Sequence, residues 1–172
     1  MLLVVWPGAA AQAAGRCGDH PWCDTSRSAA KRADLLLDAL TPAERIGLLA
    51  GDNPAGVTGA TGTHTGAALG VPRLDLPPLY LTDGPVGVRQ GQSTALPSSL
   101  ALAASFNRRL ARRDGALVGN EAKLKGNDVV YAPTINLLRT PLWGRAFESL
   151  GEDPFLTARI GVEWIAAPRL RG

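Results

Sequence analysis

The sequence is poor in the side chains that carry metal and redox chemistry. Its 172 residues include two cysteines, two histidines and one methionine. A metal site needs about four ligands, and Cys17, Cys23 and His20 are too few to supply them, so we expect no metal. Outside the cytosol, the spacing of the two cysteines instead favours a disulfide that closes a small loop, which contributes about 2 kcal/mol.

Aromatic residues and excess charge are also scarce. Aromatics make up 5% of the chain and the formal net charge is +3. Nucleic-acid binding requires basic residues interleaved with exposed aromatics. Four of the arginines instead fall on the wet face of one predicted helix, at Arg108, Arg109, Arg112 and Arg113. The composition therefore argues against nucleic-acid binding and favours a folded domain with a core of its own.

No apolar run approaches the about 20 residues that span a membrane, so we expect no membrane protein. Residues 1–7 are apolar and lead into the alanine-rich stretch 9–14, which resembles the end of a secretory signal. No Lys or Arg precedes it, so this is either the end of a longer signal or only an apolar N terminus. We treat 1–14 as a signal remnant and expect a secreted protein.

Local signals define several helices. The pattern of residues 28–40 is helical and amphipathic. Thr41, Pro42 and Glu44 form a capping box for a second helix that we expect to end at Gly51. Asn107 caps a helix that ends near Gly126, and Asp153 with Pro154 begins another that runs through Trp164. Residues 96–104 fit either a short buried strand or the start of a helix.

Residues 52–70 are rich in Gly, Thr and Ala and have no period, which predicts a long loop. His64 lies in it without an evident partner. A nucleotide-binding loop would follow a strand directly and begin a helix. The glycine-rich run does neither, so the sequence predicts no nucleotide cofactor and no cofactor of another kind.

Two buried strands, near residues 79–83 and 129–133, flank a long helical segment. Strand, helix and strand in this order predict a parallel sheet in an α/β fold. Asp83 is followed by Gly84 and Pro85, so it should lie at the C-terminal tip of its strand, where ligands meet such folds. The alternative is that Asp83 only caps its own turn.

The second strand leads into a segment dense in charge. Together the two strand ends offer a set of acidic and basic side chains that could bind a polyhydroxylated ligand through paired hydrogen bonds. The alternative is an Arg–carboxylate network that merely pins the loops. The candidates are Asp83, Arg89, Arg139, Arg145, Glu148 and Asp153.

Five ordered blocks resemble one family. They are LTDGPVGVR at 81–89, ALPSS with ASFN at 95–107, KGNDV at 125–129, GRAFES at 144–149 and GEDP at 151–154. They resemble the N-terminal domain of family 3 glycoside hydrolases, which includes β-glucosidases. The similarity runs from about residue 35 to 165, and CGDHPWCDT at 17–25 is similar to the start of secreted bacterial members.

The resemblance implies an incomplete (β/α)₈ barrel over 41–165, preceded by an extension over 15–40, and a β-linked glucoside as substrate. It implies a retaining mechanism, which uses two carboxyl groups about 5 Å apart. It assigns sugar binding to Asp83 and Arg145. It gives supporting roles to Arg89, Arg139, Glu148 and Asp153.

The family's nucleophile and acid/base match no residue of this chain, and residues 166–172 lack the expected strand and look like an aberrant tail. A complete barrel takes about 250 residues. We therefore expect the isolated chain to be marginally stable and without glycosidase activity. Three hypotheses remain: part of a β-glucosidase-like enzyme, a non-catalytic sugar-binding module or inert remnant, and a nucleotide-binding protein that the glycine pattern disfavours. The sugar, the linkage and the oligomeric state are left open.

Overall fold

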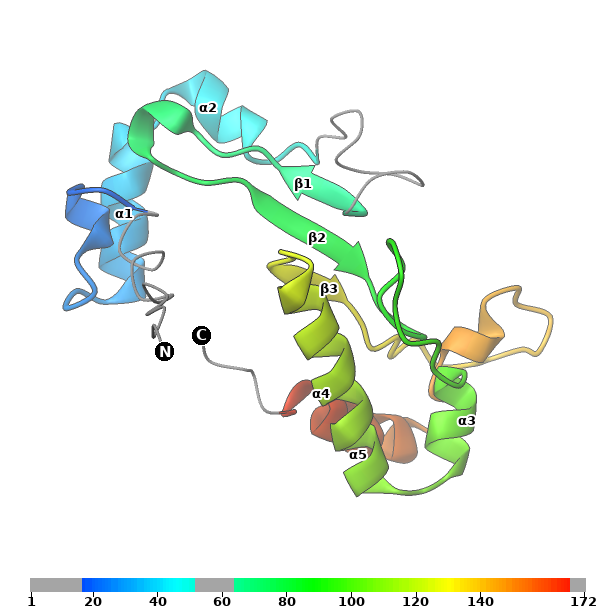
Figure 1. The fold of residues 1–172 in the computed structure, drawn as a ribbon. Helices are drawn as coiled ribbons and strands as arrows, with labels where there is room; N and C mark the ends of the chain where they lie inside the picture. Colours follow the sequence, from blue (N-terminus) through cyan, green and yellow to red (C-terminus); the bar gives the residue numbers. More distant parts are fainter. Residues whose placement is uncertain (1–16, 52–63, 168–172) are drawn as a thin grey trace, which may run out of the picture. The chain divides into compact units, whose positions relative to one another are not determined.

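The computed structural model describes residues 17–51 and 64–167 (Figure 1). The chain forms two compact units, one from residues 1–52 and 68–78 and the other from 53–67 and 79–172. The predicted signal remnant at 1–14 lies outside the described residues, as does most of the predicted tail. The predicted domain boundaries stay predictions.

The first unit begins with helices whose start signals act locally. Ser28 accepts a hydrogen bond from Lys31 N and begins α1 (Ala29–Ala39). Thr41 begins α2 (Pro42–Gly47), and its reciprocal capping box with Glu44 is present as predicted. The predicted end at Gly51 is wrong, since residues 48–50 form turns closed by bonds from Leu49 N to Ile46 O and from Ala50 N to Gly47 O. Leu49 is 87% exposed, so no tertiary packing stabilises a longer helix at this position.

A small core and a polar network hold this unit together. Cys17 and Cys23 form a disulfide with a Cα–Cα distance of 5.7 Å. They pack around a cluster of buried side chains made by Trp22, Leu40, Val71 and Leu74, the last of these in η3 (Pro72–Leu74). Trp22 belongs to the short helix η2 (Pro21–Cys23) and also stacks on the ring of His20.

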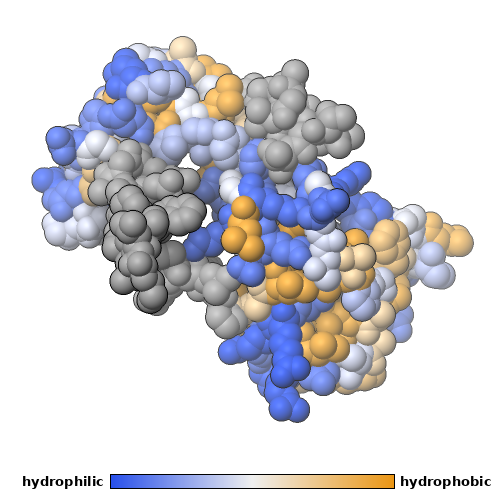
Figure 2. All heavy atoms as spheres, in the orientation of Figure 1, coloured by the Kyte–Doolittle hydropathy of each residue, from blue (hydrophilic) through white to orange (hydrophobic). Residues whose placement is uncertain are grey.

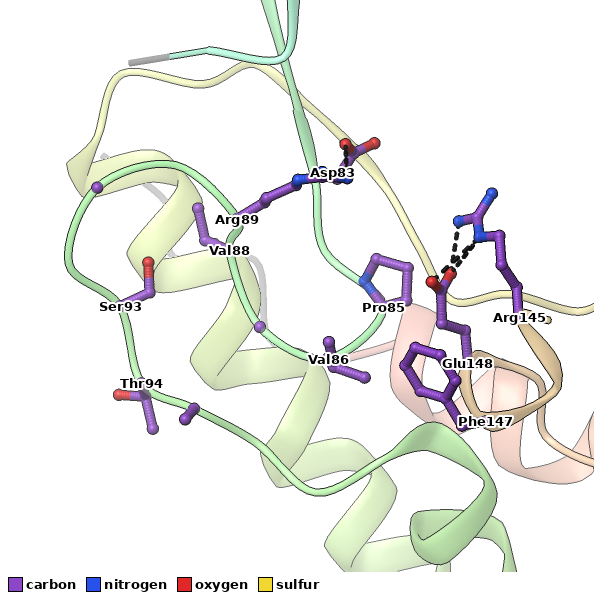
Figure 3. A pocket seen from close by; sticks show the side chains of 13 residues that line it. Asp83, Pro85, Val86, Val88, Arg89, Ser93, Thr94, Arg145, Phe147 and Glu148 are labelled. Carbon is purple, nitrogen blue, oxygen red and sulfur yellow. Dashed lines mark hydrogen bonds and ion pairs between the residues drawn. The ribbon is translucent and has the colours of Figure 1, made fainter. Parts of the chain in front are cut away.

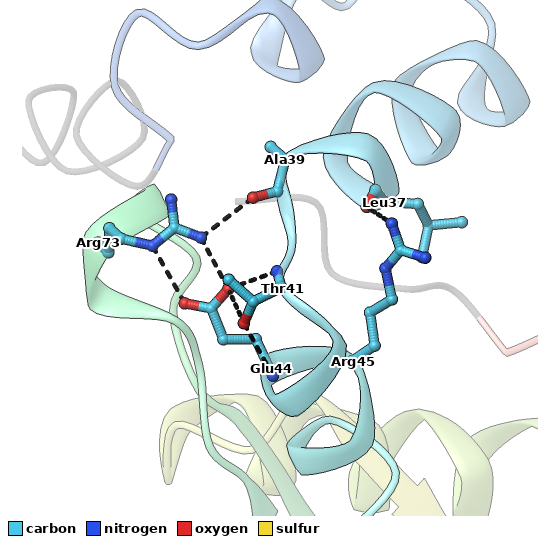
Figure 4. A network of polar contacts seen from close by, with 6 residues as sticks. All are labelled: Leu37, Ala39, Thr41, Glu44, Arg45 and Arg73. Atoms are coloured by element: carbon cyan, nitrogen blue, oxygen red, sulfur yellow. Dashed lines mark hydrogen bonds and ion pairs between the residues drawn. The ribbon is translucent and has the colours of Figure 1, made fainter.

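Arg73 ties the 68–78 segment to α2 (Figure 4). Its Nη2 donates to Glu44 Oε2 at 2.7 Å and to the carbonyl of Ala39 at 3.0 Å. The hydrogen bond from Arg73, followed by the one from the Thr41 backbone, lowers the pKa of Glu44 to about 2. Glu44 is therefore ionised at neutral pH while it caps α2 and holds Arg73.

The other unit is built on a parallel strand pair. β2 (Leu79–Asp83) and β3 (Val129–Tyr131) pair in parallel, with Leu81 opposite Val129 and Asp83 opposite Tyr131. The connection between them is helical and includes the long helix α4 (Arg108–Leu124), so the predicted strand, helix and strand arrangement is confirmed. The three-stranded sheet has the order β1-β2-β3.

The structure corrects the loop predicted for residues 52–70 and decides between the two alternatives for residues 96–104. The strand β1 (Gly66–Ala68) lies within the stretch predicted to be a loop. Its small residues carry little strand propensity, and it forms because it joins the sheet beside β2. Of the two alternatives for residues 96–104, the structure has a helix, α3 (Ser99–Ala104), capped by Ser98.

The core of this unit lies between α4 and α5 (Pro154–Ile165). Asn107 and Asp153 cap these helices as predicted. Val118 and Ile160 are each 1% exposed, and Gly115 lets the backbone of α4 approach the carbonyl of Trp164. Arg108 and Arg112 both pair with Glu163 on α5, so two of the four arginines on this helix bridge the helices.

Large apolar side chains also reach the surface around α3, α4 and α5 (Figure 2). Phe106 is 75% exposed and Phe155 is 68% exposed. Within the described residues, no helix is long and apolar enough to cross a membrane.

Candidate functional site

Asp83 lies at the C-terminal tip of β2, where the sequence predicted it. Two residues later stands Pro85, which has no backbone N–H to continue the sheet. Between them Gly84 packs closely on β3, since a Cβ there would lie 2.6 Å from Val130 Cγ1. The backbone of Asp83 is fixed on both sides, since its N–H donates to Thr65 Oγ1 at 3.0 Å and its carbonyl accepts from Arg89 N at 3.1 Å. The tip is therefore a rigid position for a side chain.

The Asp83 carboxylate does not cap its own turn. Its closest charged partner is Arg89, with 3.6 Å between Asp83 Oδ2 and Arg89 Nη1, which is longer than a hydrogen bond. Its side chain is 30% exposed, so it is available to a ligand. Among the described residues, none donates a hydrogen bond to this carboxylate. The carboxylate oxygens can therefore accept hydrogen bonds from a ligand.

Arg145 and Glu148 form a local pair in the segment after β3. Arg145 precedes the short helix η4 (Ala146–Glu148) and donates to Glu148 Oε1 at 3.1 Å and to Oε2 at 2.5 Å. The hydrogen bond and the charge of Glu148 raise the pKa of Arg145, and the charge of Asp83 adds to this effect. Glu148 is mostly buried, whereas the Arg145 side chain is 67% exposed, so the guanidinium is oriented and still accessible.

These side chains line one open cavity of about 370 Å³ (Figure 3). Asp83 comes from β2, Arg89 from the loop that follows it, and Arg145 with Glu148 from the loop after β3. Phe147 adds an aromatic surface. The rest of the lining comes from the chain between β2 and α3: Pro85, Val86, Gly87, Val88, Gly91, Ser93, Thr94 and Ala95.

Two of the six predicted rim residues lie elsewhere. Arg139 is exposed and does not line this cavity. Asp153 caps α5 by accepting hydrogen bonds from Phe155 N and Leu156 N, and it lines a different cavity beside α3. The structure therefore brings together Asp83, Arg89, Arg145 and Glu148.

His64 has a partner that the sequence did not reveal. Its Nδ1 lies 2.7 Å from Asn127 Oδ1, and its ring stacks on Tyr80 of β2. Asn127 is 63 positions away along the chain, so no short motif signals the contact. His64 is 7% exposed and helps to fix the edge of the sheet. In the part of the chain that the structure describes, no three His, Cys, Asp or Glu side chains gather as metal ligands would.

An open cavity at the C-terminal ends of parallel strands, lined by charged side chains, is the ligand position of α/β proteins. The chain matches the model of the glycosyl hydrolase family 3 N-terminal domain over residues 64–171, more than half of its length. The chain therefore belongs to glycosyl hydrolase family 3, as its resemblance predicted.

Its similarity to individual proteins covers only part of each. A β-glucosidase of Rhizobium radiobacter is 35% identical over 146 residues, which are 81% of this chain and 16% of that protein. The β-glucosidase BoGH3A of Bacteroides ovatus is 39% identical over 117 residues, 60% of this chain and 16% of that protein. The chain thus spans about a sixth of the length of these relatives.

Solved structures also match most of this chain over a small part of their own length. The structure of β-glucosidase 3B from Thermotoga neapolitana in complex with glucose matches with a TM-score of 0.70 and 32% identity, over 78% of this chain and 21% of that one. A family 3 exo-β-xylosidase in complex with a xylobiose aziridine probe matches with a TM-score of 0.67 and 31% identity, over 86% of this chain and 19% of that one.

Proposed function

We propose that this chain is the N-terminal part of a retaining glycoside hydrolase that cleaves β-linked glucosides or related β-glycosides, and that its cavity binds one sugar residue. The observation that carries the proposal is that Asp83 and Arg145 line the same cavity. A carboxylate accepts hydrogen bonds from neighbouring hydroxyls, and a guanidinium donates to hydroxyl oxygens. A sugar ring offers both kinds of partner.

In this proposal each of the four grouped residues has a role. Asp83 accepts hydrogen bonds from sugar hydroxyls, since its carboxylate has no donor among the described residues. Arg145 donates to the same sugar, and Glu148 orients Arg145 through their bidentate contact. Arg89 lies 3.6 Å from Asp83 and holds that carboxylate in place beside the cavity. Phe147 offers an apolar face to the ring.

The fold proposed for the whole enzyme domain is a (β/α)₈ barrel, of which this chain supplies an incomplete portion. The order β2, helices α3 and α4, β3 and then α5 fits the alternation of strands and helices in such a barrel. The exposed apolar side chains around α3, α4 and α5 would contact further parts of the domain. Secretion is also proposed, because disulfides such as Cys17–Cys23 persist in oxidising compartments.

The chain alone is expected to lack hydrolase activity. A retaining enzyme needs a nucleophile and an acid/base about 5 Å apart, and the proposal assigns neither role to a residue of this chain. Purified 172-residue chain incubated with an aryl β-glucoside should release no more aryl alcohol than buffer does. Turnover that Asp83→Ala removes would contradict this expectation and place the catalytic groups within the chain.

Sugar binding is tested by titrating the chain with glucose while recording calorimetry or NMR shifts. The expected result is millimolar or tighter binding that Asp83→Ala abolishes, because the main acceptor in the cavity is lost. Asp38→Ala, at an exposed position of α1, is the matched control and should bind as the unmodified chain does. Equal affinities of the Asp83 and Asp38 variants would refute the assignment of Asp83.

A second candidate function is a non-catalytic sugar-binding module. It uses the same cavity, and what favours it is that Asp83 and Arg145 line that cavity together while the proposal assigns neither catalytic carboxyl group to this chain. Millimolar glucose binding together with absent turnover supports the module for the isolated chain. Absence of both would leave an inert remnant.

A further inference from the structure

One wall of the cavity is a loop that has little support of its own. We call residues 89–95 the pocket loop; five of its residues line the cavity, namely Arg89, Gly91, Ser93, Thr94 and Ala95. Arg89 N donates to Asp83 O where the loop begins, and Leu96 N donates to Val86 O just after it ends. Between these bonds, residues 90–95 make no backbone-to-backbone hydrogen bond with any described residue. Side chains from elsewhere must therefore hold the loop.

Lys125, at the C-terminal end of α4, provides most of that support. Its Nζ donates to the carbonyls of Gln90 and Gln92 and to Ser93 Oγ, each at 2.6 Å. An ammonium group has three donors, and all three are used here. Because the donor is charged, these bonds are stronger than neutral ones. The positive charge also lies where the end of a helix favours it.

Two further contacts complete the attachment. Glu121, one turn earlier on α4, accepts hydrogen bonds from Thr94 N at 3.2 Å and from Thr94 Oγ1 at 2.6 Å. Buried Thr82, the residue before Asp83, donates from its hydroxyl to Gln90 Oε1 at 3.0 Å. The loop is thus fixed to α4 on one side and to β2 on the other.

Gly91 allows the loop to pass over the lysine. Its φ of +68° lies in the left-handed region that glycine adopts readily. A Cβ at this position would lie 3.6 Å from Lys125 Nζ. The backbone can therefore turn its carbonyls at positions 90 and 92 toward one ammonium group.

We propose that Lys125 is a positioning residue of the cavity: by holding the pocket loop it keeps Arg89 beside Asp83 and sets the wall against which the sugar binds. Lys125 itself does not line the cavity. The effect on sugar affinity rests on the proposed function. The effect on loop order does not, because it concerns the chain without any ligand.

Loop order is measured by hydrogen–deuterium exchange of peptides that cover residues 88–96, in the absence of sugar. Lys125→Met keeps the length of the side chain and removes its donors. The hydrogen-bonded amides that report on the loop are those of Arg89, Thr94 and Leu96. We expect their exchange to become about tenfold faster or more, because the opening of a segment is governed by the bonds that hold it. Lys31→Met, at an exposed position of α1, is the matched control and should change no exchange rate in the loop.

The chemical basis is tested by rescue. Both native cysteines form the disulfide, so Lys125→Cys introduces one reactive thiol. Alkylation with 2-bromoethylamine gives it an ammonium side chain of nearly the original length. Slow exchange in the loop should return after alkylation, and glucose affinity, reduced by about tenfold in Lys125→Met, should return with it. Return of both properties would assign them to the ammonium group and its contacts with the loop, and not to another effect of the substitution.

The possible outcomes separate this proposal from the one it builds on. Unchanged exchange in Lys125→Met would overturn the positioning role, whether or not glucose binds. Faster exchange with unchanged glucose affinity would also overturn it, since the loop would not shape the site. If the unmodified chain binds no glucose, the proposed function fails, while the exchange and rescue measurements still decide whether Lys125 holds the loop.

Discussion

Gly115→Val is expected to unfold the unit formed by the sheet and helices α3, α4 and α5. A Cβ at position 115 would lie 2.2 Å from the carbonyl oxygen of Trp164 and 2.9 Å from its carbonyl carbon. These are backbone atoms of α5, so no side chain can rotate away, and the two helices would have to separate. Their shared core would then open. We expect a loss of at least about 3 kcal/mol in the free energy of unfolding, at the upper end of what overpacking costs.

Gly119→Val is the matched control for this prediction. Gly119 lies one turn further along α4, and a Cβ there would meet nothing within 4 Å. Valine is a better helix former than glycine, so this variant should be as stable as the unmodified chain or slightly more so. Urea unfolding followed by far-UV circular dichroism measures both. Midpoints that agree within error would mean that α4 and α5 do not pack as closely as the structure has them.

The features that the sequence predicted depend on residues close together in the chain. Thr41 caps α2 and pairs with Glu44 three positions later, and Asn107 caps α4 through the next turn of backbone. A cap stabilises the first turn of its own helix whatever the rest of the fold does, so it can be predicted from the local sequence. The parallel pairing of β2 and β3 was also predictable, because the intervening helix leaves no short connection for an antiparallel pair.

The features that were missed depend on distant contacts. His64 looked unpartnered because Asn127 follows it by 63 positions. The three acceptors of Lys125 lie between 32 and 35 positions earlier, and two of them are backbone carbonyls that no motif can mark. Asp153 and Arg139 were grouped with the cavity residues because they follow β3. The end of a strand determines where the next loop begins, but it does not determine the path of that loop. The cap made by Asp153 was the stronger local signal.

The candidate site combines features that depend on neighbouring residues with features that depend on distant contacts. The position of Asp83 was predictable from the strand that ends at it, whereas the sugar-binding role of Arg145 was predicted only from the family resemblance. That the two line one cavity follows from the register of β2 on β3, which places Asp83 beside Tyr131 and brings both strand ends to the same edge. The sequence predicts this arrangement only through the parallel pairing. The shape of the wall between them depends on α4.

The second large effect concerns Trp164 of α5, which is 9% exposed and packs in the core that α5 shares with α4. Its Nε1 donates to Asp114 Oδ1 at 2.7 Å. Trp164→Ala should lower the free energy of unfolding by about 3–5 kcal/mol, because it leaves a cavity and removes the donor from a half-buried carboxylate. Phe155→Ala, an exposed aromatic on the same helix, is the control and should cost far less.

The carboxylate gives this variant a distinctive dependence on pH. Burial raises the pKa of Asp114, and the hydrogen bond from Trp164 opposes that rise. Without the indole the folded-state pKa should rise further, so the ionised group destabilises the fold more. For an acid whose pKa is raised on folding, stability is highest at low pH and falls as pH rises from the unfolded value through the folded one.

Asp114→Asn in the Trp164→Ala background isolates this contribution. The amide cannot ionise, so the double variant should be more stable than Trp164→Ala at pH 7, and the difference should shrink as pH falls toward the unfolded pKa of the aspartate. Chemical unfolding of both variants between about pH 4 and 7 measures this difference in stability. The range begins near the usual pKa of aspartate, about 3.9. A difference that does not vary with pH would show that the cavity alone accounts for the loss, and that the charge of Asp114 is solvated once the indole is gone.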